Sequence, residues 1–162
     1  AYEAKGSITE AVTTYNDYLK DLPKVTASDL AGLGTLYTEQ ADKLTGAAKT
    51  DAYKNADKVY ADLSEQFPAA VEFAYFMRAR VNSYMDPETK TGLSKPYYEK
   101  LAELINAKAE KDNTDNTRLI ECYRYLGYFY YLKKDTKTAD TYWHKILAID
   151  PSNETAKQAL GK

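Results

Sequence analysis

The sequence predicts an all-α fold in which antiparallel helix pairs repeat along the chain. An alanine, an aromatic residue four positions later and a proline eight positions beyond it recur at three places. The three sets are Ala11, Tyr15 and Pro23; Ala56, Tyr60 and Pro68; and Ala139, Trp143 and Pro151. No run of alternating apolar and polar residues is long enough for a strand. Such recurrence is typical of repeat proteins, in which each helix pair buries its apolar face against a neighbour.

A second motif marks the first helix of each pair. The motif begins with an aromatic residue or leucine, continues three positions later with leucine and a small residue, and ends with tyrosine three positions after the small residue. Two copies keep this pattern, and a third keeps the spacing but fewer of the residue types. The copies are Leu30-x-x-Leu33-Gly34-x-x-Tyr37, Tyr123-x-x-Leu126-Gly127-x-x-Tyr130 and the weaker Tyr75-x-x-Arg78-Ala79-x-x-Asn82. Residues three and four positions apart share one face of a helix, so each copy predicts a helix with one buried side.

Local signals for helix ends agree with the helices that the two motifs predict. Thr26-x-x-Asp29 and Ser28 offer N-terminal caps before an apolar-periodic run. The prolines of the three sets follow predicted helix ends, where a missing N–H does no harm.

These motifs resemble the tetratricopeptide repeat (TPR) family, whose pattern is W-x2-L-G-x2-Y, then A-x3-F, then P. Residues 120–153 match the whole pattern, and the resemblance covers nearly the whole chain, loosely in the middle. It implies a right-handed α–α superhelix, that is, a solenoid of antiparallel helix pairs.

Two repeats are expected to be longer than the family pattern. Gly34 and Ala56 are separated by about ten more residues than the pattern allows. The segment from Met85 to Gly92 adds a few more, and the following helix is expected to end in the polar run 110–116. We therefore divide one domain, residues 1–162, into a partial repeat at 1–25, repeats at 26–68, 69–116 and 117–153, and a capping helix or the start of a next repeat at 154–162.

Both ends of the chain fit incomplete repeats. Tyr2 and Gly6 match the end of a first helix and the turn after it, while Leu160 and Gly161 match the opening of another repeat. Solenoids need capping elements at their ends, so these segments are either worn caps or the edges of a longer array. We favour the longer array, in which this chain is one part.

The aromatic run YLGYFYYL, residues 125–132, divides between two faces of its predicted helix. The side expected to be buried carries Cys122, Tyr123, Leu126, Phe129 and Tyr130. The opposite side carries Arg124, Tyr128 and Tyr131, and the resemblance implies that it lines the concave surface of the superhelix. Cys122, on the core side, is expected to be an inert buried thiol.

The same face of the preceding repeat supplies more aromatic residues and a second arginine. The candidate ligand-binding residues of the concave face are Phe73, Phe76, Arg80, Tyr84, Arg124, Tyr128 and Tyr131. Arginine beside tyrosine suits the recognition of carboxylates and planar groups, and both residues are enriched in binding hot spots. The alternative is that the tyrosines pack on a neighbouring helix while the arginines form surface ion pairs. For the surface as a whole, we predict binding.

Motifs of catalysis and metal binding are missing from the sequence. His144 is the only histidine, and no second histidine or cysteine lies near it to complete a metal site. The segment Asp86–Gly92 resembles a calcium loop only superficially, because a lysine occupies its third acidic position. Phosphate-binding glycine loops and the G-x-S-x-G motif are also missing. We expect no enzymatic activity, no metal and no cofactor.

Composition disfavours two classes of partner. The formal net charge is −2 and basic residues are interspersed with acidic ones, so we expect no nucleic-acid binding. No stretch approaches the roughly 20 apolar residues of a membrane span, so we expect a soluble chain without membrane insertion. The single cysteine excludes an internal disulfide and is compatible with cytoplasm and periplasm alike.

The leading prediction is a non-enzymatic scaffold that binds a protein or peptide on its concave face, within a longer chain. A carbohydrate-binding module on the same scaffold is one alternative, because tyrosine and tryptophan faces stack on sugar rings. A spacer or assembly segment, which self-associates through incomplete terminal repeats, is the other.

Overall fold

The computed structural model describes residues 7–161, and over that range it contains helices and no strand. The predicted all-α class is confirmed. The chain divides after Met85 into two compact units, called here the first unit and the second unit. Tyr2 and Gly6, which the sequence assigns to the end of an opening helix, lie outside the described residues.

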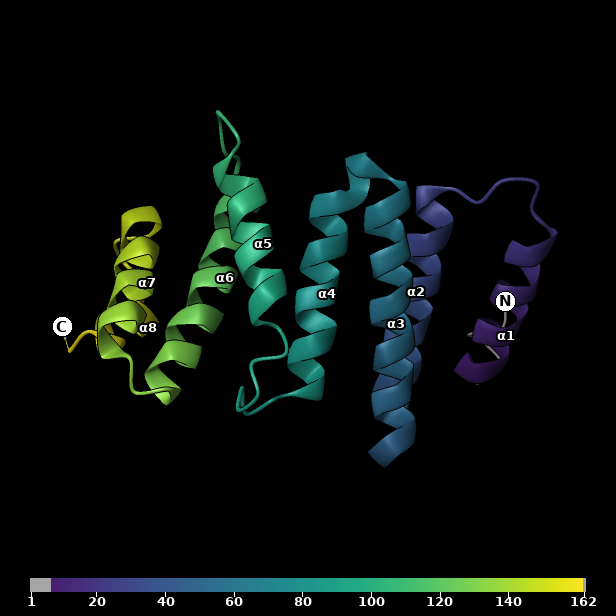
Figure 1. Ribbon diagram of the computed structural model, residues 1–162, viewed down its shortest axis with the longest axis horizontal. Helices are drawn as coiled ribbons and strands as arrows, with labels where there is room; N and C mark the ends of the chain where they lie inside the picture. The colour runs from purple at the N-terminus through teal and green to yellow at the C-terminus, as the bar shows by residue number, and fades with distance from the viewer. Residues whose placement is uncertain (1–6, 162) are drawn as a thin grey trace. The chain divides into compact units, whose positions relative to one another are not determined.

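The helices of the first unit follow one another as packed neighbours (Figure 1). In its described part they are α1 (Ile8–Asp21), α2 (Ala27–Lys43), α3 (Gly46–Gln66), the 3-10 turn η2 (Pro68–Ala70) and α4 (Val71–Met85). α1 packs on α2, α2 on α3, and α3 on α4. Packing between consecutive helices is the arrangement that the repeated motifs predict.

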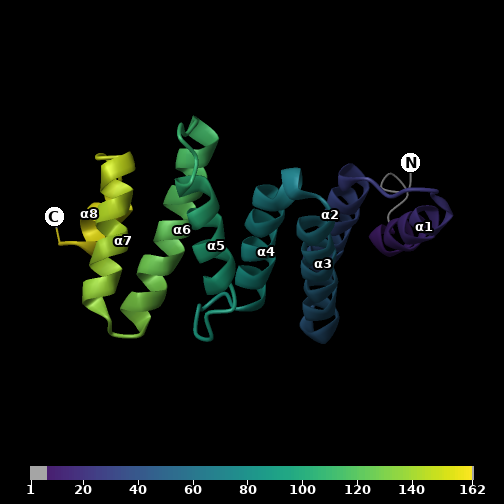
Figure 2. The same cartoon turned by 45° about the horizontal axis from the view of Figure 1, so that its top comes forward.

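The second unit is built in the same way (Figure 2). Its described helices are α5 (Lys95–Asn106), α6 (Asn113–Leu132), α7 (Thr136–Ile149) and the short α8 (Glu154–Ala159). α5 packs on α6, α6 on α7, and α7 on α8. α8 falls in the segment that the sequence assigns to a cap or to a further repeat.

The extra residues between Gly34 and Ala56 form helix rather than loop. α2 continues to Lys43 and α3 begins at Gly46, so only Leu44 and Thr45 lie between the two helices. Gly46 has a φ of +58°, a backbone conformation that glycine adopts without strain. The predicted elongation of this repeat is therefore an elongation of its two helices.

Capping boxes begin two of the helices. At α2, the side chain of Thr26 accepts a hydrogen bond from the backbone N–H of Asp29 (3.3 Å), and Asp29 accepts one from the N–H of Thr26 (2.9 Å). At α6, Asp112 and Asp115 form the same reciprocal pair at 2.8 and 3.2 Å. From the sequence, the preceding helix is expected to end in the polar run 110–116, but α5 ends earlier, at Asn106, and the run instead starts α6.

The repeated glycine and the repeated aromatic residue contact each other in both units. On α3, Tyr60 is fully buried, and a Cβ placed on Gly34 of α2 would lie 2.5 Å from its ring. On α7, Trp143 is 6% exposed, and a Cβ on Gly127 of α6 would lie 2.8 Å from its indole. The residues recur in the sequence because each ring fills space left open by a glycine on the partner helix.

The side of α6 expected to form the core is largely buried. Cys122, Tyr123 and Leu126 are 0, 5 and 1% exposed, while Phe129 and Tyr130 are half-buried. Burial raises the pKa of the Cys122 thiol, which disfavours the reactive thiolate. The prediction of a buried thiol is confirmed.

The loop between α4 and α5 folds around the carboxylate of Asp86, which is 7% exposed. Its Oδ2 accepts hydrogen bonds from the Thr91 N–H (3.0 Å), the Thr91 hydroxyl (2.8 Å) and the Gly92 N–H (2.8 Å). Its Oδ1 accepts one from the Lys90 N–H (3.0 Å). The carboxylate therefore binds the loop's own backbone. Among the described residues, no group of three or more potential ligands is placed to hold a metal ion.

Replacing Asp86 with asparagine is expected to destabilise the second unit by about 1–3 kcal/mol, because an amide NH2 would face backbone donors. Burial alone would raise the pKa of Asp86, but the hydrogen bonds from Thr91 and Gly92 hold that pKa below its ordinary value. This stabilisation is therefore present above the unfolded pKa of about 3.9 and is lost as the pH falls through the lower folded pKa.

Thermal melts followed by circular dichroism check this prediction. The difference between wild type and Asp86→Asn should be large at neutral pH and should shrink as the solution is acidified. Asp140→Asn, an exposed aspartate of the same unit, is the matched control and should change little. If wild type and Asp86→Asn differed in melting temperature by the same amount at every pH, the stabilising role of the ionised Asp86 carboxylate would be contradicted.

Candidate functional site

Four of the seven candidate residues lie on α4 of the first unit. The guanidinium of Arg80 lies 4.2 Å above the centre of the Phe76 ring, so these two side chains form a cation–π pair. Phe73, in contrast, packs edge-on against the buried ring of Tyr60, with centroids 6.2 Å apart. Phe73 therefore contributes to the core as well as to the face.

Tyr84, at the end of α4, is 48% exposed. Its ring lies 5.4 Å from that of Tyr53 on α3, at an angle of 38°. Tyr53 in turn donates a hydrogen bond from its hydroxyl to Asp42 (2.7 Å). Tyr84 is thus held by an anchored neighbour while about half of its surface stays in water.

The other three candidates, Arg124, Tyr128 and Tyr131, lie on the exposed side of α6 in the second unit. Tyr128 is 44% and Tyr131 60% exposed, and the adjacent Leu132 is 39% exposed. Leu132 is not among the binding residues predicted from the sequence, although its place at the end of the aromatic run is a signal for it. Together these four residues make one helix face that is aromatic, apolar and basic.

A cluster of tyrosines and lysines, which was not predicted from the sequence, lies between α6 and α7. Tyr130 and Tyr142 are stacked, with centroids 5.8 Å apart and planes 12° apart, and Tyr123 lies 6.0 Å from Tyr142. The ammonium of Lys145 lies 5.0 Å from the Tyr142 ring, and that of Lys95 lies 5.8 Å from Tyr130. These residues come from three helices, so no local motif reveals them.

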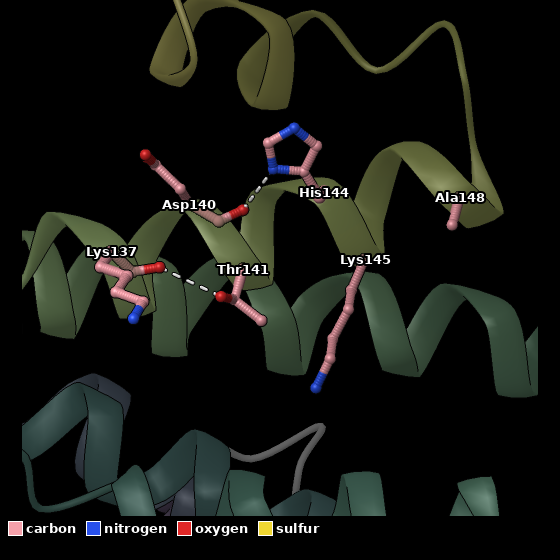
Figure 3. Close-up of a pocket in the computed structure, with 6 residues that line it drawn as sticks. All are labelled: Lys137, Asp140, Thr141, His144, Lys145 and Ala148. Carbon is pink, nitrogen blue, oxygen red and sulfur yellow. Dashed lines mark hydrogen bonds between the residues drawn. The ribbon is translucent and has the colours of Figure 1, made fainter.

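Figure 3 shows a shallow depression along one face of α7, lined by Lys137, Asp140, Thr141, His144, Lys145 and Ala148. The His144 Nδ1 lies 2.8 Å from the Asp140 carbonyl, and the Thr141 hydroxyl donates to the Lys137 carbonyl at 3.0 Å. Both side chains thus bond to the backbone of their own helix. Neither is oriented by a neighbouring group as a nucleophile or general base would be.

A second depression, of about 470 Å³, lies between α5, α6 and α7 and is called here the lysine groove. Its lining combines lysines and amides with apolar side chains. The lining residues are Asn106, Lys111, Asn116, Leu119, Tyr123, Lys145, Ala148 and Ile149.

None of the helices in the described range is apolar over the length that a bilayer crossing requires.

No protein-family model matches the chain, and no curated protein matches it. The chain is similar to a solved structure, the C-terminal part of a TPR repeat-containing protein from Cytophaga hutchinsonii, with 31% sequence identity and a TM-score of 0.78. The alignment covers 98% of this chain. The fold is a TPR-like helical repeat. The TPR-like chain spans 56% of the length of the solved structure that it matches.

TPR-like repeats typically serve as non-catalytic scaffolds for protein interaction. The glycine–aromatic contacts of Gly34 with Tyr60 and of Gly127 with Trp143 belong to this fold. Because a fold alone does not define a function, the function has to be argued from the exposed faces of the helices.

Proposed function

We propose that this TPR-like chain is a non-enzymatic scaffold that binds a protein or peptide through the exposed face of α6 and the partly exposed candidate residues of α4. The observation that carries the proposal is the division of α6. The helix buries Cys122 and Leu126 on one side, yet leaves Tyr128 and Tyr131 44% and 60% exposed on the other. Large aromatic side chains gathered on an exposed face mark interaction sites more often than scattered ones do.

The arginines add recognition of charge and of planar groups to these faces. Arg124 is exposed beside the α6 tyrosines, and Arg80 lies against Phe76 on α4. Tyrosine and arginine are the residues that most often dominate binding energy. Since both faces are parts of packed helices, little backbone order has to be gained on binding.

A peptide library displayed on phage, panned against the intact chain, supplies probes for this proposal. The affinity of each enriched peptide is then measured by calorimetry for wild type and for the double variant Tyr128→Ala and Tyr131→Ala. We expect at least about a tenfold loss of affinity, because hot-spot tyrosines contribute more than 1 kcal/mol each. Circular dichroism should show an unchanged fold, since both side chains lie on the exposed side of α6 and outside its core.

Tyr18→Ala is the matched control, because Tyr18 is 49% exposed on α1 and lies on neither proposed face. Peptides that bind the double variant as well as they bind wild type would contradict the proposal. The absence of any enriched peptide, together with a glycan whose binding the double variant loses, would instead support the carbohydrate alternative. Self-association through the terminal segments stays a prediction, which light scattering tests.

A further inference from the structure

The lysine groove is formed by three consecutive elements of the second unit. Asn106 ends α5, Lys111 lies in the link before α6, and Lys145 lies on α7. Residues from these three elements meet only because α5 packs on α6 and α6 packs on α7. The groove is separate from the exposed α6 face that carries Tyr128 and Tyr131.

The polar groups of the groove are rich in hydrogen-bond donors. Asn106 donates from its amide to the Tyr123 hydroxyl (2.8 Å), which leaves the hydroxyl proton of Tyr123 without an acceptor in the described protein. The side-chain amide of the half-buried Asn116 has no protein partner in that range either. Both groups are therefore available to an acceptor that enters the groove.

The two lysines are not neutralised by the protein. Lys111 donates only to the Lys108 carbonyl (3.3 Å), and Lys145 lies over the rings of Tyr123 and Tyr142 without a carboxylate partner in the part of the chain described. No acidic residue lines the groove. Asp115, a buried carboxylate next to Asn116 in the chain, is already paired with Lys108 at 2.5 Å.

Apolar side chains complete the groove. Leu119 is 2% exposed, and Ile149 is half-buried beside it in the lining. The lining thus combines two lysines with apolar side chains, which suits a ligand that carries both negative charge and an apolar group.

We propose that the lysine groove binds an acidic peptide segment of a partner protein. Side-chain carboxylates of the segment pair with Lys111 and Lys145, and an apolar residue between them packs on Leu119 and Ile149. Charge complementarity of this kind favours both encounter and correct partner choice. The site extends the proposed scaffold function to a second surface, and it stands or falls independently of the α6 face.

Fluorescence polarisation tests this site with a labelled peptide of sequence Asp-Glu-Leu-Asp-Glu-Leu, amidated so that only side chains carry negative charge. The intact chain should bind this peptide, and the affinity should fall as salt is added, because exposed ion pairs are screened. The Asn-Gln-Leu-Asn-Gln-Leu peptide, of equal size and no charge, should not bind. The double variant Lys111→Gln and Lys145→Gln should lose at least about tenfold in affinity.

The control is the double variant Lys54→Gln and Lys137→Gln, which also removes two positive charges. Lys54 and Lys137 are exposed and lie outside the groove. It should bind the acidic peptide like wild type. Equal binding by the two double variants would overturn the proposal, as would equal binding of the acidic and the neutral peptide. Absence of binding to wild type, or stronger binding of an oligothymidylate than of the acidic peptide, would also overturn it.

Discussion

Replacing Trp143 with alanine is expected to destabilise the second unit by about 3–5 kcal/mol, the usual cost of removing a large buried aromatic side chain. Trp143 is 6% exposed and its indole occupies the space over Gly127, so the deletion leaves a cavity between α6 and α7. The glycine opposite cannot fill that cavity. Guanidinium unfolding followed by circular dichroism measures the loss, since the variant has no tryptophan to report by fluorescence.

The neighbouring His144→Ala is the control for this variant. His144 is exposed, and within the described chain its side chain hydrogen-bonds only to the backbone of its own helix. Its replacement should change stability by less than about 0.5 kcal/mol. Hydrogen exchange resolves where the effect falls, because Trp143→Ala should accelerate exchange in α6 and α7. If Trp143→Ala were as stable as His144→Ala, the indole of Trp143 would not belong to the core.

Replacing Gly34 with alanine is expected to destabilise the first unit by about 2 kcal/mol, although alanine is the better helix former by about 1 kcal/mol. The added Cβ would lie 2.5 and 2.6 Å from two ring carbons of Tyr60. Tyr60 is fully buried, so its ring cannot move into solvent and the helices must separate instead. The overlap therefore outweighs the gain in helix propensity.

Gly32→Ala provides a matched control two residues earlier on the same helix. A Cβ there would lie 2.9 Å from the hydroxyl oxygen of Tyr15 and 3.5 Å from the ring carbon that bears it. These atoms are the far end of a half-buried side chain, which can move aside. This substitution should be neutral or stabilising in thermal melts. A further variant that joins Gly34→Ala with Tyr60→Leu should cost less than the sum of its two substitutions, because the ring is gone. If Gly32→Ala and Gly34→Ala changed the melting temperature equally, the proposed contact between Gly34 and the Tyr60 ring would be contradicted.

Features that depend on neighbours in sequence could be predicted from the residues. The capping box of Thr26 and Asp29 is one of these, and the burial of Cys122 and Leu126 on one side of α6 is another. Both follow from a spacing of three or four residues on one helix. The exposure of Tyr128 and Tyr131 on the opposite side follows from the same periodicity.

The polar residues in the weakest copy of the motif could not be interpreted in this way. Arg78 and Asn82 stand on α4 where the other copies carry leucine and tyrosine. Both donate to one carboxylate oxygen of Asp57 on α3, at 3.0 and 2.9 Å, and the Arg78 and Asp57 side chains are 17% and 22% exposed. The partner lies 21 and 25 residues away along the chain, beyond the range of any local pattern. A satisfied polar contact thus replaces an apolar one.

The two proposed binding surfaces also differ in whether residues close together in the sequence form them. Arg124, Tyr128 and Tyr131 of the α6 face were predicted from the sequence, because one helix supplies them. The lysine groove was not, because Asn106, Lys111 and Lys145 come together only when three elements pack.

The sequence by itself determined the helices, their repeated pairing and which side of α6 is buried, since each depends on residues a few positions apart. Only the tertiary structure decided that extra residues lengthen α2 and α3, that Asp86 organises a loop, and that Lys111 and Lys145 line one groove. Those outcomes depend on distances between side chains that are far apart in the chain, and packing alone sets such distances.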